Sequence, residues 1–409
     1  MQHVVVVGAG QGGVQAAASL RQEGFSGSIT LFGDEPGLPY QRPPLSKAYM
    51  ADGAAERLVL RPASFFERSG IDYREGQRVE RIDRDKREVS LSGGESLGFD
   101  HLILATGAVN WRPPIAGLDA VGVLQLRTLV HAESLRTAMM SARRAIVIGG
   151  GFIGLEFAAM ARNAGVEVTV VEAAPRLMGR AVSPAMSQWF LDVHRVQGTR
   201  VMLGTPVMSI LGDPTGRAST VVLSDGRHVD GDIVLLAAGA RPAVELAEQA
   251  GLNVQDGILV NGQLLTSDPA ISALGDCARF PLPGIGSVRL ESVQAAVDHA
   301  RYIGRRLAKG EVADYDTTPW FWSDQGKSKL QIAGLGTNAD HFEQIETPAG
   351  DPIVMAFRDD RLVAVETVNA AGPHLAARRL IGTPRMVLAE HGFDLKGVAA
   401  AMSPEQLPA

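Results

Sequence analysis

Two β-branched apolar runs are each followed by a glycine-rich turn and an alanine-rich stretch with helical periodicity. They are VVVVGAGQGG at residues 4–13 and AIVIGGGFIG at residues 145–154. Each predicts a buried strand, a tight turn and a helix, which is the context in which a G-x-G-x-x-G sequence binds a dinucleotide. The first glycine permits the bend, the second lets a pyrophosphate approach the backbone, and the third lets the helix pack on the sheet. One such turn could be only a tight connection, but two predict two dinucleotides on one chain.

The pattern after the first turn predicts the rest of a sheet. Residues 28–35 predict a second strand that ends in Asp34 and Glu35, close to where a ribose-binding carboxylate is expected. Either acid could fill that role, and one of them could be only a solvated turn residue. Short alternating runs beyond residue 70 predict a small β-meander that rejoins the sheet at LILATG. This strand ends in Ala105, Thr106 and Gly107, where a glycine again lets a cofactor approach the backbone.

A proline-rich segment, LPYQRPPLSKAYM, lies between these strands at residues 38–50. Its two prolines disfavour a helix before them, and Ser46 is expected to cap a short helix that begins near Lys47. A stiff loop of this kind would deliver Arg42 and Lys47 to a fixed place, which suits contact with an anion or a flavin. A surface loop with two solvated cations is the alternative.

The second glycine turn leads into a helix that carries Glu156, in the pattern GxGxxGxE. A carboxylate in the first helical turn is favoured by the helix dipole even without a ligand, so a purely local role stays open. The next strand, VEVTVVE, ends in Glu172, where a carboxylate accepts hydrogen bonds from a ribose 2′-hydroxyl and repels a 2′-phosphate. NADH is therefore expected rather than NADPH, although Arg176 and Arg180 could soften the discrimination.

The middle of the chain repeats the pattern of strands, glycine turn and helices found in its first part. Helical patterns at residues 126–140 and 183–198 accompany short strands, and LLAAGARP, which contains Gly239, echoes LILATGAVNWRPP. This internal duplication predicts an α/β fold with two Rossmann-like dinucleotide-binding domains of similar build. The first domain is expected to be interrupted by the second, with boundaries at 1–112 and 236–316 for the first and 113–235 for the second. Residues 317–409 are expected to form a smaller α+β domain that ends in two helices.

The region around residues 264–325 carries four further candidates. A strand ends at Gly275 and Asp276, and the Asp276 carboxylate could accept hydroxyls of a ribityl chain. An amphipathic helix follows, whose first-turn amides could stabilise negative charge on a reduced flavin. The helix ends in a basic cluster, usually no more than a solvated helix end, made of Arg305, Arg306 and Lys309. The aromatic run beyond it, in the core or at the surface, contains Trp320, Phe321 and Trp322.

Composition and charge argue against several classes of function. The 409 residues carry a net charge of −6 and no polybasic run, so nucleic-acid binding is not expected. Nothing approaches about 18 consecutive apolar residues and no leader pattern precedes the first strand, so we expect a cytoplasmic protein without a membrane span. The nine histidines are scattered, and no metal site is expected. Because Cys277 is the only cysteine, no redox disulfide can form within the chain, and we expect its thiol to be buried without a catalytic role.

An ordered series of motifs spans nearly the whole chain: GxGxxG, RPPLSK, LILATG, GGGFIGLE, TSDPAISALGDCARF, ESVQAA and PWFWSDQ. With this series the sequence resembles the oxygenase-coupled NADH-ferredoxin reductases of the glutathione-reductase-like flavoproteins, in particular the putidaredoxin-reductase-like members. The resemblance implies FAD on the first domain, NADH on the second, and a C-terminal domain that covers the flavin and helps to receive an iron–sulfur partner.

The resemblance also assigns residues. It places Lys47 beside the flavin with Glu156 close to it, so that an ion pair would orient the lysine near flavin N5. FAD contacts are implied at Gly12, Asp34, Lys47, Val79, Arg127, Asp276 and Val293, with Arg42 as a further candidate. Together with the turns, the candidate FAD residues include Gly8, Gly10, Gly13, Glu35, Ala105, Thr106 and Gly107. The candidate NADH residues are Gly149, Gly151, Ile153, Gly154, Glu172 and Gly239.

The implied reaction passes hydride from NADH to FAD and then single electrons to a 2Fe–2S ferredoxin in two encounters. Docking is expected to use the basic cluster together with Trp320 or Trp322, on a monomer or weak dimer. A rubredoxin or other carrier reductase is the nearest alternative enzyme. A different class is an NADH-sensing flavoprotein switch of the apoptosis-inducing-factor type.

Overall fold

The computed structural model describes residues 1–402 and divides into two compact units. Unit 1 is made of Met1–Arg42, Ala54–Val109 and Ala240–Thr317. Unit 2 is made of Pro43–Gly53, Asn110–Gly239 and the described residues from Thr318 onwards. The chain leaves unit 1 at β8 (Ala108–Asn110) and re-enters it at β17 (Ala240–Pro242). The finer three-domain boundaries expected from the sequence stay predictions.

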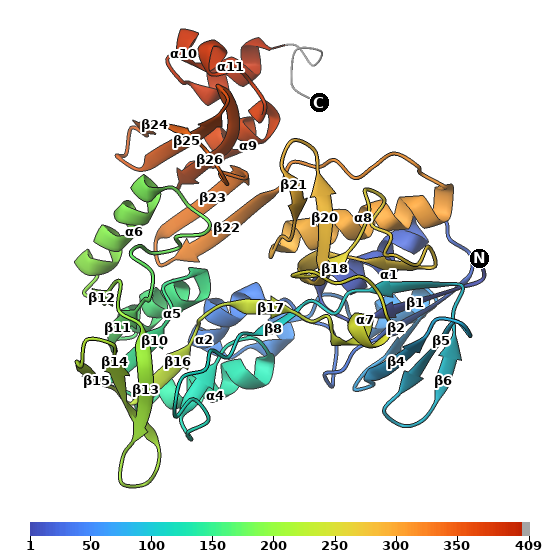
Figure 1. Ribbon diagram of the computed structural model, residues 1–409, viewed down its shortest axis with the longest axis horizontal. Helices are drawn as coiled ribbons and strands as arrows, with labels where there is room; N and C mark the ends of the chain where they lie inside the picture. The colour runs from blue at the N-terminus through green and yellow to red at the C-terminus, as the bar shows by residue number, and fades with distance from the viewer. Residues whose placement is uncertain (403–409) are drawn as a thin grey trace. The chain divides into compact units, whose positions relative to one another are not determined.

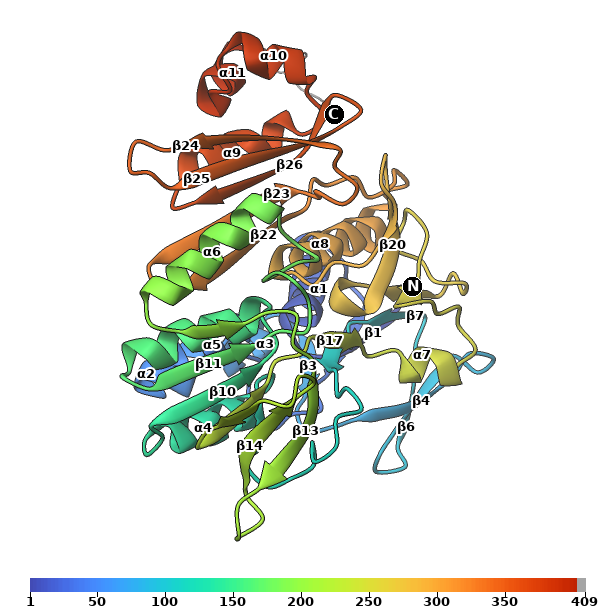
Figure 2. The same ribbon diagram turned by 60° about the vertical axis from the view of Figure 1, so that its left-hand side comes forward.

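Unit 1 is built on a five-stranded parallel sheet in the order β19-β7-β1-β2-β3. Its strands are β1 (His3–Val7), β2 (Ser28–Phe32), β3 (Ile71–Arg74), β7 (His101–Leu104) and β19 (Ile271–Ala273). β1 is the central strand, pairing Val5 with Thr30 and with Leu102, and its valines are buried, as is typical of a parallel sheet covered on both faces. Helices α1 (Gln11–Gln22) and α8 (Val293–Lys309) pack against each other beside this sheet (Figure 2).

Smaller elements complete unit 1. The predicted meander is an antiparallel three-stranded sheet of β4 (Val79–Asp83), β5 (Glu88–Leu91) and β6 (Ser96–Gly98). A second small sheet contains β18 (Ile258–Leu259), β20 (Ala278–Leu282) and β21 (Gly286–Val288). Short helices are η2 (Ala55–Leu58), α3 (Ala63–Arg68), α7 (Glu245–Gln249) and η3 (Gly275–Cys277).

The first part of unit 2 repeats the architecture of unit 1. Its five-stranded parallel sheet has the order β12-β11-β10-β16-β9. The strands are β9 (Val123–Gln125), β10 (Arg144–Ile148), β11 (Glu167–Val171), β12 (Arg200–Met202) and β16 (Ile233–Leu236). An antiparallel sheet of β13 (Val207–Gly212), β14 (Ala218–Leu223) and β15 (His228–Asp230) shares one apolar core with them. The helices are α4 (Leu129–Met139), α5 (Phe152–Asn163) and α6 (Pro184–Val196).

The C-terminal part of unit 2 is an antiparallel sheet in the order β22-β23-β26-β25-β24. Its strands are β22 (Trp320–Gln325), β23 (Ser328–Gly334), β24 (His341–Glu346), β25 (Pro352–Arg358) and β26 (Arg361–Val368). Figure 1 shows helices gathered against it, namely α9 (Ala371–Leu380), α10 (Arg385–Glu390) and α11 (Leu395–Ala401). The predicted fold class is confirmed, but the expectation of two terminal helices is wrong, because Pro384 and Asp394 begin separate short helices.

The segment around Lys47 also departs from its prediction. A 3₁₀ turn, η1 (Pro43–Ser46), leads directly into α2 (Ala48–Asp52). The cap residue of α2 is Lys47, and no side chain caps the helix. Ser46 does not act as the cap because its hydroxyl is directed to Glu156, at 2.6 Å.

A buried carboxylate ties β26 to α6. The backbone N–H and hydroxyl of Ser183, the cap residue of α6, each donate to one oxygen of Glu366 at 2.6 Å. Glu366 is only 3% exposed, and burial raises its pKa to about 7. The two bonds from Ser183 and the charge of Arg176 lower it in part.

Glu366→Gln is expected to change how stability depends on pH. Between pH 4.5 and 7 the folded chain keeps a proton on Glu366 that the unfolded chain has released, so raising the pH destabilises the wild type over that window. Glutamine keeps the shape of the protonated side chain and does not titrate. The advantage of Glu366→Gln should therefore grow to on the order of 2 kcal/mol near pH 7 and then level off.

The measurement is the difference in thermal midpoint between Glu366→Gln and wild type from pH 4.5 to 8. Glu346→Gln is the matched control, because that carboxylate is exposed on β24. Parallel midpoint curves for wild type and Glu366→Gln would contradict the assignment.

Candidate functional site

The two glycine turns have the same backbone geometry. Gly8 has a φ of 106° and Gly149 a φ of 116°, in the region that favours glycine. A Cβ on Gly8 would lie 2.3 Å from the carbonyl oxygen of Ala105, and a Cβ on Gly149 would lie 2.3 Å from that of Ala237. Both positions require glycine because each turn touches the end of the neighbouring strand.

The third glycine of each turn packs on the first. A Cβ on Gly13 would lie 1.8 Å from the carbonyl oxygen of Gly8, and a Cβ on Gly154 would lie 2.3 Å from that of Gly149. These contacts bring the first turn of each helix against the preceding loop. The same close packing therefore occurs at both predicted dinucleotide sites.

The middle glycines face open space. Gly10 and Gly151 are the cap residues of α1 and α5, and neither helix has a side-chain cap. A Cβ at either position would meet no atom within 4 Å, and neither residue has a positive φ. Each helix therefore presents first-turn N–H groups beside an open glycine backbone, which fits the pyrophosphate of a dinucleotide.

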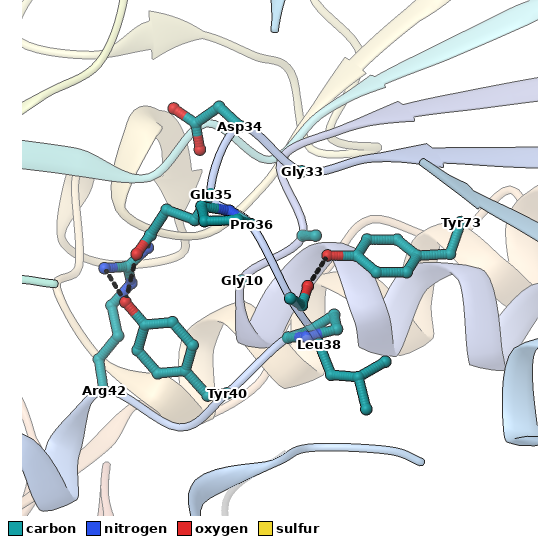
Figure 3. A pocket seen from close by; sticks show the side chains of 12 residues that line it. Gly10, Gly33, Asp34, Glu35, Pro36, Leu38, Tyr40, Arg42 and Tyr73 are labelled. Carbon is teal, nitrogen blue, oxygen red and sulfur yellow. Dashed lines mark hydrogen bonds and ion pairs between the residues drawn. The ribbon is translucent and has the colours of Figure 1, made fainter. Parts of the chain in front are cut away.

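A pocket beside Gly10 contains the two predicted acids of unit 1 (Figure 3). Glu35 is committed to neighbours, since one oxygen is 2.6 Å from Nη2 of Arg42 and the other accepts from the Tyr40 hydroxyl. Asp34 is exposed, and Figure 3 shows its carboxylate apart from the Glu35–Arg42 pair. The geometry therefore favours Asp34 for a ribose, and it gives Arg42 an ion-pair partner within the loop.

Tyr73 forms another wall of this pocket. Its hydroxyl donates to the carbonyl oxygen of Gly37 at 2.7 Å. Burial, helped by Glu75, Glu35 and Asp34, raises the pKa of Tyr73 to about 12. The phenol is therefore a neutral donor that fixes the loop after β2.

The end of β19 lies beside α1. A Cβ on Gly12 would lie 2.4 Å from the side chain of Leu274, and the Gly275 N–H donates to Nδ1 of buried His299 at 3.2 Å. Asp276 follows in η3, and Val293 begins α8. Unit 1 thus brings Gly12, the Asp276 turn and the start of α8 into one region.

The remaining FAD candidates lie in different places. Thr106 donates from Oγ1 to the carbonyl oxygen of Ala243 at 2.7 Å, and Gly107 has a φ of 70°. Val79 is buried in β4 of unit 1. Arg127 lies just before α4 in unit 2.

Glu172 is held against the second glycine turn. Its two carboxylate oxygens accept from the N–H of Gly150 at 2.6 Å and the N–H of Ala174 at 2.7 Å. Arg176 is directed elsewhere, because its guanidinium donates to the carbonyl oxygens of Val182 and Gly179. The fixed carboxylate suits a ribose 2′-hydroxyl, and Arg176 is poorly placed to offset its charge.

Two further NADH candidates surround the same turn. Ile153 is 42% exposed in the first turn of α5. Gly239 has a φ of 113°, and a Cβ there would lie 3.4 Å from the guanidinium of Arg180.

Glu156 is the centre of a buried polar cluster in unit 2. Its Oε2 accepts from Lys47 Nζ at 2.8 Å and from Ser46 Oγ at 2.6 Å. Its Oε1 accepts from Ser323 Oγ at 2.7 Å and from the N–H of Asp324 at 3.3 Å. The structure thus contains the expected ion pair and adds two serines that sequence reasoning did not connect to it. They lie 110 and 167 positions from Glu156, so no local pattern marked the contacts.

The basic cluster on α8 differs from the prediction. Arg306 is only 8% exposed and donates to the carbonyl oxygen of Gln263 and to Ser272 Oγ. Its predicted role in docking is wrong, because the guanidinium points into unit 1. The other two cations form ion pairs with carboxylates, Arg305 with Glu311 and Lys309 with Glu23.

The tryptophans of β22 are partly buried. Their rings lie 5.6 Å apart, and the guanidinium of Arg378 lies 4.8 Å from the Trp320 ring. Cys277 is fully buried as expected, and burial raises the pKa of its thiol.

Within residues 1–402, no three or more acidic, histidine or cysteine side chains are grouped so that they could hold a metal ion. Within the same range, no helix combines the length and apolar character needed to cross a bilayer.

Comparisons with known proteins agree with the duplicated fold. Rhodocoxin reductase of Rhodococcus erythropolis is 47% identical over 400 residues, which cover 96% of this chain and 93% of that protein. A ferredoxin reductase from Rhodopseudomonas palustris matches with a TM-score of 0.93 and 43% identity, covering 98% of this chain and all of the other. The covalent putidaredoxin reductase–putidaredoxin complex contains a chain with a TM-score of 0.92 and 37% identity, at 98% coverage of both.

Family matches divide the chain in the same way. Residues 320–399 match the reductase C-terminal family. Residues 2–300 match the family described as pyridine nucleotide-disulphide oxidoreductase. The chain therefore belongs to the pyridine nucleotide-disulphide oxidoreductase family.

Proposed function

We propose that this chain is an FAD-dependent ferredoxin reductase. It accepts hydride from NADH and passes electrons one at a time to a 2Fe–2S ferredoxin that serves an oxygenase. The observation that carries this function is similarity along nearly the whole length to reductases of small electron carriers. The family name refers to disulfides, but the sole cysteine of this chain is buried, so a cysteine pair of its own cannot relay the electrons.

The residues of each unit have separate tasks in this proposal. FAD, when bound, supplies the group that takes up two electrons as hydride and returns them singly. In unit 1, the uncapped N-terminus of α1 binds its pyrophosphate and Asp34 a ribose. In unit 2, the N-terminus of α5 binds NADH, and Glu172 selects it over NADPH. Glu156 orients Lys47, whose ammonium group stabilises the negative charge that hydride uptake creates.

The decisive experiment is a screen of purified carriers for NADH-driven reduction by the FAD-loaded protein. Rapid reduction of a 2Fe–2S ferredoxin, with NADH far more effective than NADPH, is the expected result. Faster reduction of rubredoxin would support the alternative carrier. A long-lived NADH complex that reduces no carrier would instead support the redox switch.

Docking is proposed to involve Arg305 and Lys309 on α8 and, separately, the tryptophans of β22. Lys309→Glu should slow ferredoxin reduction a few-fold at low ionic strength, because it reverses one steering charge. The rates of variant and wild type should converge at high salt. Reduction of an uncharged quinone is the control and should not change. A rate deficit that persists at every salt concentration would exclude steering.

The cytoplasmic location and the monomeric or weakly dimeric state remain predictions.

A further inference from the structure

Strand β22 is aligned on helix α5 by two contacts. Phe152 and Glu156 are four residues apart and so share one face of the helix. Phe321 and Ser323 are two residues apart and so share one face of the strand. The two phenylalanine rings lie 4.5 Å apart, and the Ser323 hydroxyl is 2.7 Å from the Glu156 carboxylate. The aromatic contact thus sets the register that places Ser323 opposite Glu156.

A further polar contact supports this register. Gln325, on the same face of β22 as Ser323, is fully buried. Its Oε1 lies 2.9 Å from Nε2 of His194 on α6, and its amide donates to the sulfur of Met178. The Gln325 amide also lies 3.4 Å from the Ser323 hydroxyl, so the stretch of β22 that carries Ser323 is anchored on both sides, by Phe321 and by Gln325.

The Ser323 hydroxyl donates the shorter of the two hydrogen bonds to Oε1 of Glu156. Oε2 accepts from both Lys47 and Ser46, whereas Oε1 accepts from Ser323 and, at the longer distance of 3.3 Å, from the N–H of Asp324. Glu156 is 6% exposed, so water cannot readily replace a lost donor. A buried carboxylate that lacks a donor on one oxygen is expected to rotate, and its hold on Lys47 would then weaken.

We propose that Ser323 is a positioning residue for NADH oxidation. Its hydroxyl fixes Glu156, and Glu156 in turn fixes Lys47 on the Pro43–Gly53 segment. The C-terminal sheet thereby contributes to the first half of the reaction through one side chain. This inference rests on the proposed roles of Lys47 and Glu156, but its structural step can be measured without turnover.

Hydrogen–deuterium exchange of the amides in residues 43–53 is the first readout. Ser323→Ala should accelerate exchange there about tenfold, because it removes a hydrogen bond to a charged group. Ser323→Thr keeps the hydroxyl and should restore slow exchange. The matched control is Ser328→Ala, a buried serine at the start of β23 that is not among the donors to Glu156. Ser323→Cys, with a weak donor of similar size, replaces the alanine variant if that variant does not fold.

A double-mutant cycle tests whether the effect runs through Glu156. In a Glu156→Gln background, Ser323→Ala should add little to the exchange rate. In stopped-flow experiments, Ser323→Ala alone should lower the limiting rate of flavin reduction more than it raises the NADH dissociation constant. Unchanged exchange in residues 43–53, or an equal effect in both backgrounds, would overturn the proposal. A changed exchange rate with no change in flavin reduction would instead reject the roles given to Lys47 and Glu156.

Discussion

Gly151→Ala is expected to leave the fold and the bound FAD intact while raising the NADH dissociation constant about 10- to 100-fold. The added methyl group meets no protein atom within 4 Å, and the backbone there is not strained. It would lie on the side of the turn where we place the pyrophosphate, and it would keep the phosphates from the first-turn amides. Gly10→Ala should have the corresponding effect on FAD.

The four glycines allow the effect of a substitution on cofactor binding to be distinguished from its effect on folding. At Gly8 or Gly149 an alanine would collide with the backbone and destabilise the protein whether or not a cofactor is bound. At Gly10 or Gly151 an alanine methyl group could collide only with a bound cofactor, so only cofactor affinity should change. The measurements are FAD content, NADH titration and thermal midpoint for each variant. Gly93→Ala is the control, because its Cβ also meets no atom within 4 Å but the residue belongs to the connection between β5 and β6 and to neither glycine-rich turn. Unaltered affinities in Gly10→Ala and Gly151→Ala would remove both glycines from the binding sites.

Glu156→Gln is expected to slow flavin reduction at saturating NADH by up to about 100-fold. The amide has the size of the carboxylate, but it lacks the charge that holds Lys47 at 2.8 Å and offers only one acceptor oxygen. Lys47 would then lose its fixed position, whereas the α5 N-terminus and Glu172 would still bind NADH. The limiting rate should therefore fall more than the affinity for NADH.

Stopped-flow bleaching of the flavin over a range of NADH concentrations gives both quantities. Glu167→Gln, at an exposed carboxylate on β11, is the control for a change of net charge. An unaltered limiting rate would remove Glu156 from the chemistry. A large loss of affinity with an unchanged limiting rate would make it a binding residue instead.

Much of the fold could be predicted because its information is local. Each glycine turn and its apolar strand lie within ten residues, and the structure has the predicted strand, turn and helix at both places. The meander and the strand that returns to the sheet were also predicted, from alternating apolar and polar residues and from the turn residues between them. The number of C-terminal helices was predicted wrongly, because α10 and α11 have only 6 and 7 residues, too few to show a clear helical period.

The error at Arg306 has a physical explanation. Its charge suggested a solvated helix end, but its position places it on the buried face of α8. It follows Tyr302 by four residues and Ile303 by three, and both of these side chains are buried. Helical spacing was therefore the signal that could have separated it from Arg305.

The hydroxyl contacts to Glu156 could not be foreseen in the same way. The prolines before Ser46 and the helical pattern after it predicted a helix cap. Ser323 lies next to Trp322 in an aromatic run, and no role was predicted for it. Which side chain meets a distant carboxylate depends on the register between β22 and α5. That register is set by tertiary packing and not by sequence spacing.

The burial of Cys277 makes this chain convenient for site-specific labelling. Its thiol is fully enclosed, so maleimide dyes should react with the native protein only after a cysteine has been added at the surface. Exposed Met386 offers one such position, because it lies on α10, which supplies none of the donors to Glu156 described above. A redox-active probe or an electrode tether could then be attached to a single chosen point without first removing a native cysteine.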